Sequence, residues 1–121
     1  TEIDFIHLSC WDCFKISTDY PKDKRTLTEW FTQSIDDLPT VISTGGIWST
    51  KDAEAVMSQG ADLIGVGRVA IPYPEWAANL NIKDYSPQKM PFSSKDLSKA
   101  DLSKVFIDYM KNWRGFVKDE K

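Results

Sequence analysis

Between residues 40 and 68 the chain alternates short apolar runs with glycine turns. A β-branched run ends in Gly45-Gly46, and a second apolar run, beyond a helix-like segment, ends in Gly67-Arg68. This order of strand, turn, helix, strand and turn defines one βαβ unit. The carboxyl ends of its parallel strands lie at the same edge of the sheet, so we expect the two turns to be neighbours in space.

The composition of the two turns is typical of a phosphate-binding site. Glycine leaves backbone N–H groups accessible to a ligand, and an arginine adds a planar cation. We therefore predict that the chain binds a phosphate group at these turns. The predicted site residues are Gly45, Gly46, Gly67 and Arg68. The alternative is that the glycines only form tight turns and that the arginine is a surface residue.

The overall composition excludes several functional classes. The 121 residues are 41% hydrophobic and carry a formal net charge of −3, as is typical of a globular domain. This balance gives no basic surface for nucleic acid, and no apolar run approaches the roughly 20 residues that span a membrane. Two cysteines form no disulfide framework, so we expect a cytoplasmic protein. Because Thr1 is neither an initiator Met nor part of a signal sequence, we expect an internal cut in a longer protein.

Further elements are predicted in the first half of the chain. Residues 3–9 read as a buried parallel strand, and residues 28–35 as a short helix whose N-cap is Thr28. Ser49 and Asp52 form a capping-box pattern at the start of the helix within the βαβ unit. The side of that helix that faces the sheet is predicted to contain Ala53, Val56 and Met57. Gly60 is predicted to end the helix in a left-handed backbone conformation.

The second half of the chain has weaker patterns. Pro74 fits the first position of a short helix, and residues 81–100 are polar, interrupted by prolines and predicted to be irregular. A final helix is expected to begin at Asp101 or Ser103. Its predicted apolar stripe contains Val105, Phe106, Tyr109, Met110 and Trp113.

A long polar segment, residues 10–24, follows the first strand. Loops of this length at the end of a strand are often lids or binding loops. Cys10 and Cys13 have the spacing of redox and metal sites, but two thiols cannot complete a four-ligand metal site, so we predict free thiols. His7, inside the first strand, is predicted to be a hydrogen-bonded structural histidine.

Parallel strands that are each followed by a helix occur in doubly wound sheets and in (β/α)₈ barrels. The first class carries G-x-G-x-x-G in one turn, which is absent here, whereas glycine turns after two successive strands match the phosphate site of a barrel. A complete barrel needs about 250 residues. We therefore predict an α/β fold, the C-terminal half of a (β/α)₈ TIM barrel, with about three parallel strands, flanking helices and a C-terminal helix. Residues 1–80 are assigned to barrel strands six to eight with the phosphate loops, and residues 81–121 to a C-terminal extension.

Four short segments carry a family resemblance. They are D-F-I-H-L-S at residues 4–9, S-T-G-G-I at 43–47, A-D-L-I-G-V-G-R at 61–68 and P-E-W at 74–76. Together they resemble the C-terminal half of the old yellow enzyme family, whose members are FMN-dependent barrels that oxidise NADH or NADPH and reduce activated C=C bonds. The resemblance implies that the predicted glycines and arginine hold the FMN phosphate, and that the electron acceptor is a small molecule such as an activated alkene.

The catalytic half of that family's site does not occur in this sequence. The family's histidine pair and tyrosine proton donor lie on earlier strands, so the resemblance implies an oxidoreductase as the parent protein and an inactive piece here. Alternatives are a non-catalytic half-barrel as isolated, or part of another phosphate-binding barrel such as a dihydroorotate-dehydrogenase-like enzyme. Because the outer strands would have unpaired edges, we expect association with the missing N-terminal half-barrel or with a second copy as a homo-oligomer.

Overall fold

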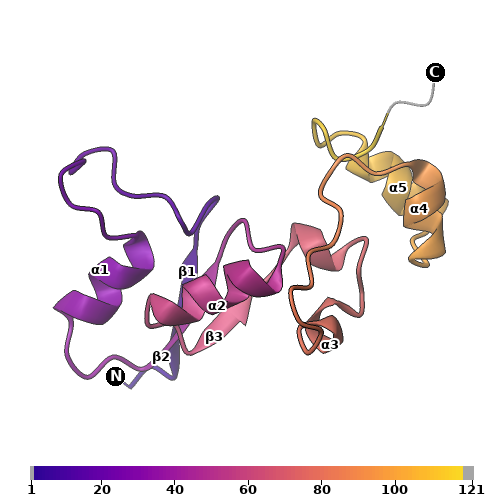
Figure 1. Cartoon of the computed structure of the whole chain (residues 1–121). Helices are drawn as coiled ribbons and strands as arrows, with labels where there is room; N and C mark the ends of the chain where they lie inside the picture. Colours follow the sequence, from indigo (N-terminus) through magenta and orange to yellow (C-terminus); the bar gives the residue numbers. More distant parts are fainter. Residues whose placement is uncertain (1, 119–121) are drawn as a thin grey trace. The chain divides into compact units, whose positions relative to one another are not determined.

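The computed structural model describes residues 2–118, and Figure 1 shows its helices and strands. The chain folds as two compact units, of which the first ends at Gly67 and the second begins at Arg68. The first unit contains the sheet, and the second is built from short helices and turns. The division expected after residue 80, between barrel strands and an extension, stays a prediction.

The sheet consists of three parallel strands in the order β1-β2-β3. They are β1 (Phe5–Ser9), β2 (Thr40–Thr44) and β3 (Leu63–Gly65), so the third is shorter than its apolar run. Consecutive order occurs both in barrels and in each half of a doubly wound sheet. The structure therefore confirms the α/β class and the three parallel strands, and the barrel stays a prediction.

Helix α1 (Leu27–Ser34) is capped by Thr26 and not, as predicted, by Thr28. The Thr26 hydroxyl accepts the Glu29 N–H, and the Glu29 carboxylate accepts the Thr26 N–H at 2.8 Å. This reciprocal capping box satisfies two donors that the first turn would leave unpaired. Thr28 is fully buried, and its hydroxyl bonds that of Ser43 in β2 at 2.8 Å. The prediction was wrong because Thr28, two residues after the true cap, has a buried polar partner in the sheet.

Helix α2 (Thr50–Ser58) begins as predicted. The Ser49 hydroxyl accepts the Asp52 N–H, and the Asp52 carboxylate accepts the Ser49 N–H at 2.9 Å. Val56 is fully buried on the predicted inner side, but Met57 is 45% exposed. Met57 was therefore placed wrongly, because the stripe that this helix buries is narrower than the apolar pattern.

Helices α1 and α2 cover the same face of the sheet. Thr32 of α1 donates its hydroxyl to the Gln59 carbonyl, directly after α2, at 2.7 Å. Gly60 has the predicted left-handed backbone, with φ of +96°, and any side chain there would collide with Thr32. Within the described first unit no helix covers the other face, where Phe5 and Leu63 are 57% and 53% exposed. We call this the open face.

The second unit contains short helical segments between turns. They are η1 (Arg68–Ala70), α3 (Trp76–Asn79), α4 (Ser94–Lys99) and α5 (Lys104–Met110). Pro74 does not open α3, which begins two residues later. Helix α4 was missed, because six residues are too few to show a helical period. Nowhere in residues 2–118 is a helix both long and apolar enough to cross a lipid bilayer.

Helix α5 begins after Ser103, as predicted, but of the predicted apolar stripe it buries only Met110, which is 5% exposed. Its other buried residue is Ile107, at 3% exposed, whereas Val105 is 81% exposed. The other members of the predicted stripe that stay largely in solvent are Phe106, Tyr109 and Trp113. The apolar pattern around this helix is nearly continuous, so the packing of its neighbours selects the buried side.

An aromatic cluster forms the centre of the second unit. The ring of Phe92 lies 6.0 Å from that of Tyr73 and 5.5 Å from that of Phe116, measured between centroids. The Phe92 N–H donates to the Phe116 carbonyl at 2.8 Å, and the Lys118 N–H donates to the Phe92 carbonyl at 2.7 Å. This pairing joins residues 116–118 to the segment before α4.

Candidate phosphate site at the carboxyl end of the sheet

The two glycine turns lie side by side in the first unit. Strands β2 and β3 pair in parallel, with Thr44 opposite Gly65. Gly45 and Gly46 follow the first of these strands, and Gly67 follows the second by two residues. The structure therefore brings three of the four predicted residues to one edge of the sheet.

Gly45 is enclosed by the loop that follows β1. Its φ is +141°, and a Cβ there would overlap the Cys10 carbonyl oxygen and lie 3.1 Å from the Cys13 nitrogen. The Cys10 N–H donates to the Thr44 carbonyl at 2.9 Å, and the Cys13 N–H donates to the Gly45 carbonyl at 3.1 Å. Glycine is required at this position so that the loop can dock against the end of β2.

Gly46 has a left-handed backbone, with φ of +71°, and lies beside an acidic side chain. A Cβ on Gly46 would be 3.8 Å from Oδ1 of Asp12. That oxygen accepts the Phe14 N–H at 2.9 Å, which fixes the carboxylate near the turn. An anion bound at Gly46 therefore needs donors strong enough to offset the Asp12 charge.

Gly67, unlike Gly45, has open space beside it. Nothing in the described chain lies within 4 Å of the position that its Cβ would occupy, and its backbone is not left-handed. Arg68, the next residue, is the first of η1 and belongs to the second unit. The convergence of its guanidinium on the glycine turns stays a prediction.

The backbone of the turns fits a phosphate group. Within residues 2–118, no hydrogen bond from the N–H groups of Gly46 and Gly67 to another backbone group is found. Unpaired N–H groups at one edge, with open space beside Gly67, are the donors that phosphate oxygens accept from. The residues present therefore fit a phosphate-bearing cofactor, with the Asp12 carboxylate as the feature that opposes it.

A polar group beside these turns was underrated from the sequence. Nε2 of His7 in β1 lies 2.7 Å from Oγ1 of Thr44, the last residue of β2, so the predicted hydrogen-bonded histidine is confirmed. A Cβ on Gly65 in β3 would overlap that hydroxyl and lie 3.3 Å from the same imidazole nitrogen. The sequence did contain one sign of this contact: Gly65 lies inside a short apolar strand, and such a glycine often marks the close approach of another group.

A separate cavity of about 660 Å³ lies between the loop after β1 and α1. The apolar residues that line it are Leu27, Trp30 and Phe31 of α1 and Ile35, directly after this helix. Cys10 and Asp12 line its other side, so this cavity adjoins the docked loop and not the open face. The buried indole N–H of Trp30 has no hydrogen-bond partner in the described chain.

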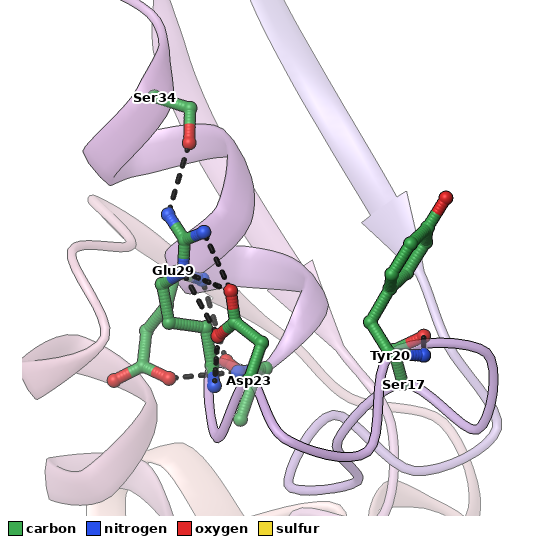
Figure 2. A network of polar contacts seen from close by, with 7 residues as sticks. Ser17, Tyr20, Asp23, Glu29 and Ser34 are labelled. Carbon is green, nitrogen blue, oxygen red and sulfur yellow. Dashed lines mark hydrogen bonds and ion pairs between the residues drawn. The ribbon is translucent and has the colours of Figure 1, made fainter.

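The end of the long loop is fixed to α1 by polar contacts (Figure 2). Arg25 donates to both carboxylate oxygens of Asp23 and to the Ser34 hydroxyl at 3.1 Å. Its guanidinium carbon also lies 4.1 Å from the centre of the Trp30 ring. The hydrogen bonds from Arg25 hold the pKa of Asp23 below its usual range. The loop is therefore anchored at both ends, against β2 and against α1.

The two thiols of the docked loop are free and poorly reactive. Burial raises the pKa of Cys13 to about 11, and the neighbouring Cys10 and Asp12 contribute to the shift. Burial, and then the Asp12 charge, also raise the pKa of Cys10. A thiol that stays protonated is a weak nucleophile and metal ligand. Among residues 2–118, no three His, Cys, Asp or Glu side chains gather as a metal site.

NADH-dependent oxidoreductases are the class of known proteins that this chain resembles. It is 33% identical to NADH:fumarate oxidoreductase of Klebsiella pneumoniae (strain 342) over 82 residues, 64% of this chain. It is 33% identical to NADH:acrylate oxidoreductase of Vibrio harveyi over 79 residues, 62% of the chain. It is 23% identical to the probable NADH-dependent flavin oxidoreductase YqiG of Bacillus subtilis (strain 168) over 116 residues, 96% of the chain.

The matched segments are small parts of these relatives. They span 9%, 8% and 31% of the respective proteins. No family model matches the chain, and no solved structure matches it. The likeness is therefore to small parts of NADH-dependent oxidoreductases, one of which is named as a probable flavin oxidoreductase.

Proposed function

We propose that this chain is the phosphate-binding part of an FMN-dependent NADH oxidoreductase of the old yellow enzyme type, built on the C-terminal half of a (β/α)₈ barrel. The observation that carries the proposal is the pair of glycine turns side by side beyond β2 and β3. Phosphate loops after two successive parallel strands are the arrangement that barrel enzymes use. The likeness to three NADH-dependent oxidoreductases supports the same assignment.

Each predicted residue has a distinct role in this proposal. The N–H groups of Gly46 and Gly67 donate to the phosphate, and Gly45 lets the loop after β1 dock behind them. Arg68, which directly follows Gly67, adds a positive charge that favours binding of the phosphate. FMN held at these turns would supply redox chemistry between NADH or NADPH and a small-molecule acceptor. Two relatives are named for fumarate and acrylate, which supports an activated alkene as that acceptor.

The remaining half of the site comes from outside this sequence in our proposal. Strands β1 and β3 are the outer strands of the sheet, and apolar side chains such as Phe5 and Leu63 are exposed on its open face. An uncovered apolar sheet with unpaired edges favours hydrogen bonding to further strands. We propose that an N-terminal half-barrel, or a second copy of this chain, completes the structure in the cytoplasm.

FMN retention by the native protein tests the proposal. Gly67→Val fills the open space beside the turn, and Arg68→Ala removes a charge-assisted hydrogen bond of about 1.5–3 kcal/mol. Both variants are expected to lose FMN on gel filtration, with occupancy read from the visible flavin absorption. Arg114→Ala, which removes an exposed arginine of the second unit, is the matched control and should retain FMN. Wild-type occupancy in both site variants would reject the assignment. Binding of inorganic phosphate without FMN would favour another phosphate-binding barrel.

A further inference from the structure

His7 of β1, Thr44 of β2 and Gly65 of β3 lie together on the open face, toward the carboxyl end of the sheet. We call these three residues the cluster; two of them have polar side chains. Nε2 of His7 lies 2.7 Å from the Thr44 hydroxyl. Thr44 is paired with Gly65, and any side chain on Gly65 would overlap that hydroxyl. The glycine therefore provides the space that the His7–Thr44 pair occupies.

The cluster faces away from the two helices. Successive residues of a strand point to opposite faces, and Ser43 bonds Thr28 of α1, so its neighbour Thr44 points to the open face. His7 is exposed there, on a face that otherwise shows apolar residues such as Phe5 and Leu63. Packing of the sheet against the helices does not require an imidazole at this position.

The pair keeps hydrogen-bonding capacity for a ligand in either tautomer of the histidine. If Nε2 accepts from the Thr44 hydroxyl, the other ring nitrogen of His7 is a donor and the hydroxyl oxygen can still accept. If Nε2 donates, the other nitrogen accepts and the hydroxyl can still donate. Within the described chain no hydrogen bond to that other nitrogen is found. A ligand group that both donates and accepts, such as an alcohol, matches this capacity.

We propose that His7 and Thr44 bind the hydroxylated ribityl chain of the flavin nucleotide. This inference rests on the proposed function, because it uses the phosphate position at the glycine turns. Thr44 directly precedes Gly45-Gly46, so its backbone lies within about 7 Å of the second glycine, the reach of two residues at about 3.3 Å each. The ribityl hydroxyls are the groups of FMN that adjoin its phosphate. The pair then fixes the chain between phosphate and ring.

The test compares FMN with an analogue in which a plain phosphopentyl chain replaces the ribityl phosphate. Binding of both to the native protein and its variants is measured by quenching of flavin fluorescence. The native protein should bind FMN about tenfold more tightly than the analogue, the loss expected for one or two hydrogen bonds. Thr44→Val and His7→Phe should bind the two ligands equally. Thr44→Ser, which keeps the hydroxyl, should preserve the preference.

Thr40→Val is the matched control, because Thr40 lies on the same strand and face at the far end of the sheet. It should bind FMN and the analogue as the native protein does. A structural role for the cluster would weaken both ligands equally and keep their ratio, and that result would overturn the inference while leaving the phosphate site intact. A native protein that binds no FMN would instead reject the proposed function, and this inference with it.

Discussion

The turn after β2 and the turn after β3 both contain glycine, but the structure uses their glycines differently. Gly45 is packed against the backbone of Cys10 and Cys13, and its left-handed φ excludes other residues. Gly67 has open space beside it and an ordinary backbone. One glycine serves the packing of the protein, and the other leaves room for a ligand. Composition alone cannot separate these two uses, because both read as a glycine at the end of a strand.

The first turn is also fixed from its other side. Oδ2 of Asp52 accepts the N–H groups of Trp48 and Ser49, each at 2.9 Å. The start of α2 therefore holds the chain that leaves Gly46, and the docked loop holds the chain that enters Gly45. At Gly67, by contrast, no described atom lies within 4 Å of the position that a Cβ would occupy. We therefore expect substitutions at the first turn to act on stability and those at the second to act on ligand binding.

Gly45→Ala is expected to have the largest effect. Its Cβ would overlap the Cys10 carbonyl oxygen in a backbone conformation that alanine rarely adopts, and these penalties together are on the order of 2–5 kcal/mol. Chemical denaturation of the variant, followed by circular dichroism, measures the loss. A variant as stable as the native protein would show that the loop does not dock as described.

The burial of Cys13, behind the first turn, predicts that the protein loses stability at alkaline pH. Its folded pKa of about 11 exceeds its ordinary value of 9.0, so the unfolded chain releases the thiol proton first. The free energy of unfolding should therefore fall as pH rises from about 9 to 11, by at most about 2–3 kcal/mol from this group. Denaturation across that pH range should show a smaller fall in Cys13→Ala. Identical pH profiles for the two proteins would contradict the burial of this thiol.

Asp52→Ala tests the anchor on the far side of the first turn. It removes the acceptor of two backbone N–H groups and one half of the capping box, so we expect a loss of about 1–2 kcal/mol in the free energy of unfolding. Asp96→Ala serves as the comparison, because Asp96 lies at the capped start of α4 in the second unit and its carboxylate is exposed. If both variants lost the same stability, the special anchoring of the first turn would be disproved.

Gly67→Ala is expected to have the smallest effect on stability. No described atom lies within 4 Å of the new methyl group, so the free energy of unfolding should change by no more than about 0.5 kcal/mol. Thermal unfolding of this variant beside Gly45→Ala measures the contrast directly. A large destabilisation at Gly67 would mean that both glycines serve packing, and would remove the structural basis of the phosphate site.

Local chemistry made several features predictable from the sequence. The capping box of Ser49 and Asp52 and the left-handed Gly60 depend on residues a few positions apart, and both predictions are confirmed. The cap of α1 was misplaced by two residues, because Thr26 and Thr28 are both suitable by type. Only the position of Ser43 in the neighbouring strand makes Thr28 a buried residue. The shift therefore came from a contact between residues distant in the chain.

Local patterns were enough to define the parallel α/β unit, because hydrophobic period and glycine positions are properties of short segments. They also predicted that Gly45 follows β2, whereas β3 ends at Gly65, two residues before Gly67. The enclosure of Gly45, the open space at Gly67 and the contact of His7 with Thr44 over Gly65 appear only in the folded structure. These facts depend on the register of three strands and on a loop that returns to the end of β2. Register and loop docking are set by contacts between segments far apart in sequence, and such contacts leave no periodic pattern in either segment.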